Sequence, residues 1–133
     1  MNLISIRIIT ANIGVLIEFY EKIMNTSAIQ YTADFAEIQT KTATLAIGSI
    51  NTLKFFGDEN IAPENRSAII EFLVDDVDKE FERQRDFLTS YIVQEPTLMP
   101  WGNKSLLLRD PDGNLINLFT PYTQQAKEKF QKI

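Results

Sequence analysis

The sequence predicts an α+β fold in which two similar βαβββ units form a curved mixed sheet around a cleft. Twice along the 133 residues, an alternating apolar stretch leads into an amphipathic helix and then into further strand-like stretches. A shift of 64 residues superposes the two patterns, placing Ser5 on Ile69 and Asn12 on Asp76. One helix covers only one face of a small sheet, so the two uncovered faces can curve around a shared cleft.

The first unit begins with a strand predicted over residues 3–10. Its alternation puts Ile4, Ile6 and Ile8 on one face and Ser5, Arg7 and Ile9 on the other. Asn12 is a typical N-cap, and apolar residues at helical spacing then predict a helix over 13–24. Residues 28–33, 35–40, 43–47 and 52–56 have strand-like composition and merge into three strands, and a polar connector over 57–66 follows.

The second unit repeats this order. A strand is predicted over 68–74, a helix capped by Asp76 over about 77–88, and strands near 91–95, 103–109 and 114–120. The last two strands are joined by residues 110–114, where Pro and Gly indicate a tight turn. We therefore expect one domain over 1–121, with halves of about 1–57 and 67–121. The tail, 122–133, is interpreted as a loosely docked helix or, alternatively, a dimer arm.

The composition excludes several classes of function. The chain has no cysteine and no histidine, which excludes disulfides, thiolate nucleophiles and the commonest transition-metal ligand. A formal net charge of −5 disfavours nucleic acid, which needs clustered Lys and Arg. No apolar stretch approaches the ~20 residues of a membrane span, and the N-terminus lacks the pattern of a signal peptide. We expect a cytoplasmic protein without a membrane or nucleic-acid partner.

Several motifs together resemble the vicinal oxygen chelate superfamily, also called the glyoxalase/bleomycin-resistance/extradiol-dioxygenase fold. They are Phe19-Tyr20, the stretch Phe72 to Asp78, Pro100-Trp101-Gly102, and Asp110-Pro111-Asp112-Gly113-Asn114 with the strand that follows it to Leu118. The resemblance covers roughly residues 3–121. It implies the paired βαβββ fold, but it does not imply one chemistry, because this fold hosts unrelated functions.

Enzymes of that superfamily hold a divalent metal, and the resemblance places their ligand positions on Ser5, Ile69 and Asn117. The fourth position falls on Lys54, or on Leu53 if the alignment slips by one residue. Ile69 has no donor atom and Lys54 would repel a cation, whereas metal ions need carboxylate, carbonyl, imidazole or thiolate ligands. The departure of this chain from the ligand pattern of those enzymes therefore predicts that it has no metal, and we expect no other cofactor.

Strand alternation predicts a mixed site on the faces away from the helices. Its members are expected to be Ser5, Arg7, Lys54, Phe56, Glu71, Asn117 and Phe119, with Trp101 at the mouth of the cleft. Two alternatives remain open. Arg7 and Glu71 either orient a ligand or pair with each other and fill the cleft, and Trp101 either lines the cleft or packs at a sheet edge or dimer contact.

These observations favour a metal-free protein that binds a small organic molecule, like the bleomycin-resistance proteins, which sequester a bulky ligand in a homodimer. The ligand class implied is an antibiotic or another aromatic or charged compound. One alternative is a metal-independent or divergent enzyme of the lyase or isomerase class, with Glu71 as its general base. Another is a structural or regulatory domain whose cleft has collapsed. We expect a homodimer, because the fold leaves sheet edges and a concave face that need cover.

Overall fold

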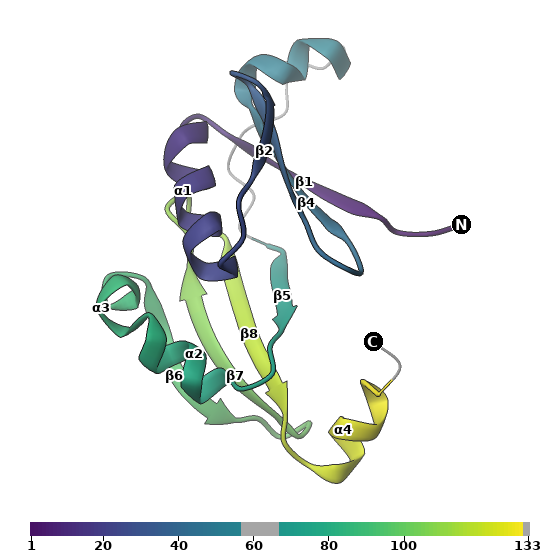
Figure 1. Cartoon of the computed structure of the whole chain (residues 1–133), viewed down its shortest axis with the longest axis vertical. Helices are drawn as coiled ribbons and strands as arrows, with labels where there is room; N and C mark the ends of the chain where they lie inside the picture. The colour runs from purple at the N-terminus through teal and green to yellow at the C-terminus, as the bar shows by residue number, and fades with distance from the viewer. Residues whose placement is uncertain (57–66, 132–133) are drawn as a thin grey trace. The chain divides into compact units, whose positions relative to one another are not determined.

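The computed structural model describes residues 1–56 and 67–131, which fall into two compact units, 1–65 and 66–133. Each unit contains a four-stranded mixed sheet. Figure 1 shows the helices of each unit beside its strands. The predicted α+β class with two related units is confirmed. The predicted connector over 57–66 lies outside the described residues. None of the helices in the described ranges is long and apolar enough to cross a membrane.

The first unit has a sheet in the order β1-β4-β3-β2, with β1 parallel to β4 and the other pairs antiparallel. Its elements are β1 (Ser5–Thr10), α1 (Ile13–Met24), β2 (Ile29–Thr32), β3 (Phe35–Gln39), β4 (Thr44–Ser49) and the 3-10 helix η1 (Ile50–Phe56). Asn12 caps α1 by accepting a hydrogen bond from the backbone of Val15, as its position predicted. Phe19 and Tyr20 are buried, and α1 packs on β3 and β4.

The strand predicted over 52–56 is wrong, because these residues belong to η1. The turn chemistry explains the error. The hydroxyl of Thr52 donates to the carbonyl oxygen of Ser49 at 2.7 Å, and the backbone N–H of Asn51 donates to the hydroxyl of Ser49 at 3.1 Å. Such local bonds between side chain and backbone compete with strand pairing. They bend the chain at the end of β4 despite the apolar composition that follows.

The second unit repeats the topology with the order β5-β8-β7-β6 and with β5 parallel to β8. Its elements are β5 (Ile69–Leu73), α2 (Val77–Arg83), α3 (Arg85–Leu88), β6 (Ile92–Leu98), β7 (Asn103–Arg109), β8 (Leu115–Pro121) and α4 (Gln124–Lys129). The single helix predicted over 77–88 is divided at Gln84, whose backbone angles leave the helical region. Both pieces still bury the predicted apolar stripe, including Phe81 and Leu88.

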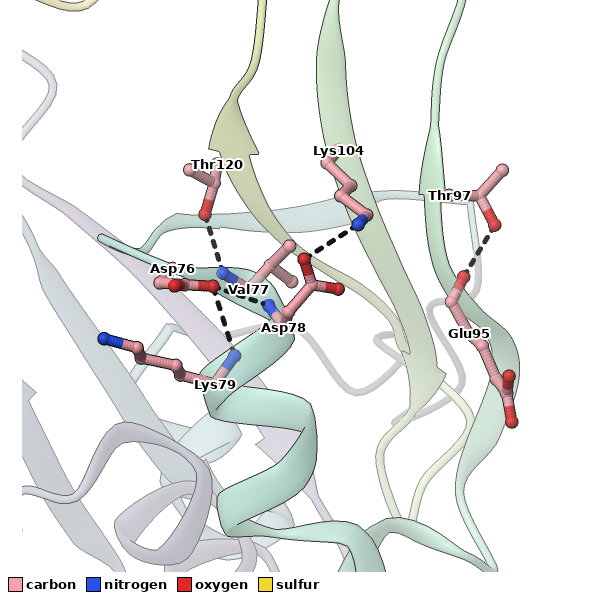
Figure 2. A network of polar contacts seen from close by, with 8 residues as sticks. All are labelled: Asp76, Val77, Asp78, Lys79, Glu95, Thr97, Lys104 and Thr120. Carbon is pink, nitrogen blue, oxygen red and sulfur yellow. Dashed lines mark hydrogen bonds and ion pairs between the residues drawn. The ribbon is translucent and has the colours of Figure 1, made fainter.

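Polar side chains fix the N-terminal end of α2, as Figure 2 shows. The carboxylate of Asp76 accepts hydrogen bonds from the backbone of Asp78 and Lys79, and the Thr120 hydroxyl accepts one from the backbone of Val77. Lys104 on β7 donates to Asp78 at 2.7 Å, and this bond raises the pKa of the Lys104 ammonium. These contacts confirm that Asp76 caps α2, whereas Asp78 ties the first turn of α2 to its sheet through Lys104.

The turn over 110–114 is also built by its own residues. The buried Asp110 accepts hydrogen bonds from the backbone of Asp112 and Asn114 and from the Asn114 side chain. Gly113 takes a positive φ of 90°, which favours glycine. Asp110 and Asp112 are therefore parts of the turn, as predicted.

The two units correspond more closely than the sequence indicated. β4 and β8 hold the same place, because each pairs in parallel with the first strand of its unit. Each is followed by a short helix, η1 or α4. Thr52 of η1 lies close to Gly48, and Phe130 at the end of α4 contacts Phe119, with ring centroids 5.3 Å apart. The tail is thus a docked helix and the counterpart of η1.

Candidate functional site

Each sheet has one face covered by the helix that follows its first strand and an opposite face that we call the open face. In the first unit the buried Ile8, Ile47 and Ala36 are cross-strand neighbours on the covered face. The adjacent register row, on the open face, contains Arg7, Ala46 and Glu37. Strand alternation thus brings a cation and a carboxylate onto one face, with the small Ala46 between them.

Arg7 packs on an aromatic surface within its own unit. The guanidinium carbon of Arg7 lies 4.5 Å from the centroid of the Phe35 ring. The Tyr31 ring in turn stacks on Phe35, with the two ring centroids 6.0 Å apart. Such contacts between a cation and an aromatic ring stabilise the charge at a partly exposed site. Phe35, Tyr31 and Glu37 were not among the predicted site residues, because the strand boundaries after α1 were not resolved by pattern. The alternation of Phe35 and Glu37 with buried Ala36 was the available indication.

The other predicted residues of the first unit are placed differently. Ser5 is exposed at the start of β1. Lys54 and Phe56 belong to η1 and not to a strand, so the alternation used to assign them to the open face is wrong. The Lys54 ammonium lies 5.4 Å from the ring centroid of the exposed Phe55.

In the second unit Glu71 and Asn117 are direct neighbours across β5 and β8. The Asn117 amide nitrogen donates to a Glu71 carboxylate oxygen at 2.8 Å. Asn117 is only 5% exposed, and its carbonyl oxygen has no hydrogen-bond partner among the described residues. This pair is the part of the predicted site that the structure brings together.

Two aromatic residues predicted for the site differ in their exposure. Phe119 is buried on the open face, where the Phe130 ring packs against it. Trp101 is 64% exposed in the turn between β6 and β7.

A surface depression of about 450 Å³ lies over residues 109–113 and contains none of the predicted site residues. Arg7 and Glu71 lie in different units, and their role as ligand contacts or as a mutual pair stays a prediction.

The strand register corrects one predicted metal-ligand position. Arg7 pairs with Ala46 as Glu71 pairs with Asn117, so Ala46, and not Lys54, is the counterpart of Asn117 in the first unit. Ala46 and Ile69 have no side-chain donor, and the Asn117 amide is already bonded to Glu71. Within the described ranges, no group of three His, Cys, Asp or Glu residues is arranged to hold a metal ion. These residues do not fit the divalent ion of the metal-dependent enzymes.

Comparisons with known proteins agree with this architecture. A glyoxalase/bleomycin resistance protein/dioxygenase from Nocardioides superposes with a TM-score of 0.76 at 17% identity, covering 93% of this chain and 85% of that one. A family enzyme from Burkholderia phytofirmans PsJN gives 0.76 at 13% identity, covering 91% and 99%. An integron cassette protein from V. cholerae gives 0.66 at 25% identity, covering 90% and 94%.

A search of curated proteins finds no match. The model of one family, however, matches residues 2–118, which is most of the chain. Together with the two βαβββ units, this match decides the family. The chain belongs to the Glyoxalase/Bleomycin resistance protein/Dioxygenase superfamily.

Proposed function

We propose that this chain binds a small organic molecule, aromatic or charged, without a metal ion. The observation that carries the proposal is the buried carbonyl oxygen of Asn117, which has no partner among the described residues although its amide nitrogen is held by Glu71. A buried polar atom without a hydrogen bond costs folding free energy, and native proteins retain few of them. A ligand that donates to this oxygen accounts for its retention.

The open face of the first unit supports the same function. The stack of Arg7, Phe35 and Tyr31 offers a flat, cationic and partly exposed surface. Such a surface suits an aromatic ligand, because rings gain both apolar burial and favourable electrostatics on stacking. We also propose a cytoplasmic homodimer. All four residues of β2, the edge strand of the first sheet, are exposed, and a second copy is a common cover for such an edge.

A thermal-shift screen of aromatic compounds that differ in charge tests the binding function. We expect at least one compound to raise the melting temperature saturably, because a ligand that binds only the folded state stabilises it by mass action. Asn117→Leu should keep the fold, because it removes an unpaired buried oxygen, and should lose the shift. Gln125→Leu, which changes an exposed amide on α4, is the control and should keep it. The proposal fails if no compound binds or if Asn117→Leu binds as the unchanged chain does.

A further inference from the structure

We propose that the open face of the second sheet recognises the cationic end of its ligand, an amidinium, guanidinium or ammonium group carried on an aromatic or apolar body. This inference rests on the proposed binding function and specifies the ligand class for one of the two open faces. It is carried by the polar atoms of this face that have no partner within residues 1–56 and 67–131, by their chemical type, and by the positions of the nearby charges.

Asn117 is not the only buried polar group on this face. Leu107 on β7 pairs directly with Asn117, so the two side chains point to the same face. Ser105 and Asn103, two and four residues before Leu107 on the same strand, point to that face as well. Ser105 is completely buried and Asn103 is 9% exposed. The Ser105 hydroxyl oxygen and the Asn103 carbonyl oxygen, like that of Asn117, have no partner among the described residues. Ser105 is a diagonal neighbour of Asn117, at roughly 7 Å, so the two unpartnered oxygens lie within the span of one small ligand.

These atoms are mainly acceptors. The hydrogen bond from the Asn117 amide nitrogen to Glu71 fixes the orientation of that amide, so its remaining free atom is the carbonyl oxygen. The Asn103 atom is also a carbonyl oxygen, and the Ser105 hydroxyl can accept as well as donate. The adjacent Glu71 carboxylate, in its ionised form, has hydrogen-bond acceptors and no donor. A ligand group that satisfies this set must present several hydrogen-bond donors, as the N–H groups of an amidinium, guanidinium or ammonium do.

The charges around this face favour a cation. Strands β5 to β8 carry two cationic side chains, Lys104 and Arg109. Lys104 points to Asp78 of α2 on the covered side, as Figure 2 shows. Arg109 has the same orientation as Ser105 and Leu107, but it lies at the end of β7, where it donates to the Gly113 carbonyl oxygen at 3.0 Å. Neither forms an ion pair with Glu71 among the described residues. A cationic ligand would form charge-assisted hydrogen bonds there, which are stronger than neutral ones.

The same face supplies an apolar wall for the body of the ligand. Phe119 follows Asn117 by two residues on β8, and the Phe130 ring from the end of α4 packs against it. Lys129 on α4 lies 5.3 Å from the Phe130 ring, but its side chain is exposed and its charge is screened by solvent. Aromatic rings beside a carboxylate suit a compound with a planar apolar part and a cationic end.

Three probes of nearly equal shape test the ligand class: benzamidinium, benzamide and benzoate, each titrated calorimetrically into the full chain. We expect benzamidinium to bind most tightly and benzoate least. Glu71→Gln should weaken benzamidinium binding about tenfold, as for loss of a charged hydrogen-bond partner, and leave benzamide nearly unchanged. Glu95→Gln removes the same charge from an exposed position on β6 and should have little effect. Ser105→Ala should weaken benzamidinium binding without lowering the melting temperature of the free chain.

The outcomes separate this inference from the proposed function. If benzoate or benzamide binds as tightly as benzamidinium, the cationic class is wrong while the binding function stands. Equal losses in Glu71→Gln and Glu95→Gln would show nonspecific attraction and overturn the site. Benzamidinium binding that neither Glu71→Gln nor Ser105→Ala changes places the site elsewhere. If none of the three probes and no compound in the wider screen binds, the binding function itself fails.

Discussion

Gly102 is the residue at which a single methyl group should disturb the second unit most. It has a φ of 97°, and its carbonyl oxygen accepts hydrogen bonds from the backbone of Tyr122 and Thr123. A Cβ atom at this position would lie 2.2 Å from the hydroxyl oxygen of Thr123, which caps α4 by accepting from the backbone of Ala126. Gly102→Ala therefore strains the backbone and displaces the cap.

The expected loss follows from these two effects. A left-handed conformation costs a non-glycine residue about 1–2 kcal/mol. Rotating the Thr123 hydroxyl away from the new methyl group breaks the cap, which costs about 1 kcal/mol. Gly102→Ala should thus lower the free energy of unfolding by about 2–3 kcal/mol, measured by urea denaturation at neutral pH.

A second mutation separates the two contributions. In a Thr123→Ala background the cap is already lost, so Gly102→Ala should cost about 1 kcal/mol less than in the unchanged chain. Gly14→Ala is the matched control, because a Cβ there meets nothing within 4 Å and the position is helical. It should be neutral or stabilise by up to about 1 kcal/mol. Strictly additive losses for Gly102→Ala and Thr123→Ala would refute the reasoning.

Four further predictions follow from other parts of the chain. Asp76→Ala should destabilise the fold by about 1 kcal/mol in urea denaturation, because it removes the cap of α2, and an unchanged midpoint would contradict this. Hydrogen bonds from Ser49 and Asn51 lower the pKa of Asp34. The ionised Asp34 therefore contributes to the stability of the fold above the ordinary pKa of an aspartate, and this contribution is lost as the pH falls through the lowered pKa. The difference in stability between the unchanged chain and Asp34→Asn should therefore shrink on acidification. Elemental analysis of protein purified without added metal should find no stoichiometric nickel, zinc, iron or manganese. Light scattering should give about twice the chain mass of 15.2 kDa, and a monomer at micromolar concentration would argue against the homodimer.

The fold could be predicted from the sequence wherever local chemistry and periodicity agree. Asn12 and Asp76 cap helices at the predicted positions, and the turn over 110–114 is built by Asp110. The prediction failed where side-chain hydrogen bonds to the backbone override the strand propensity of the residues. Residues 52–56 look like a strand, but Ser49, Asn51 and Thr52 turn the chain into η1. The equivalence of η1 and α4 was invisible in the sequence, because their residues share no pattern.

The candidate site shows the same division. Residue types alone determined that His and Cys chemistry is absent, and alternation on β5 put Glu71 on the face opposite Phe72. Only the tertiary structure decided that Asn117 is its hydrogen-bond partner and that Ala46 is the counterpart of Asn117. It also showed that the Ser105 hydroxyl and the Asn103 carbonyl oxygen are buried without a partner in the part of the chain that the structure describes. The physical reason is that alternation assigns a side chain to a face within one strand. Strand order and register, which arise from pairing between distant segments, decide which side chains meet on that face.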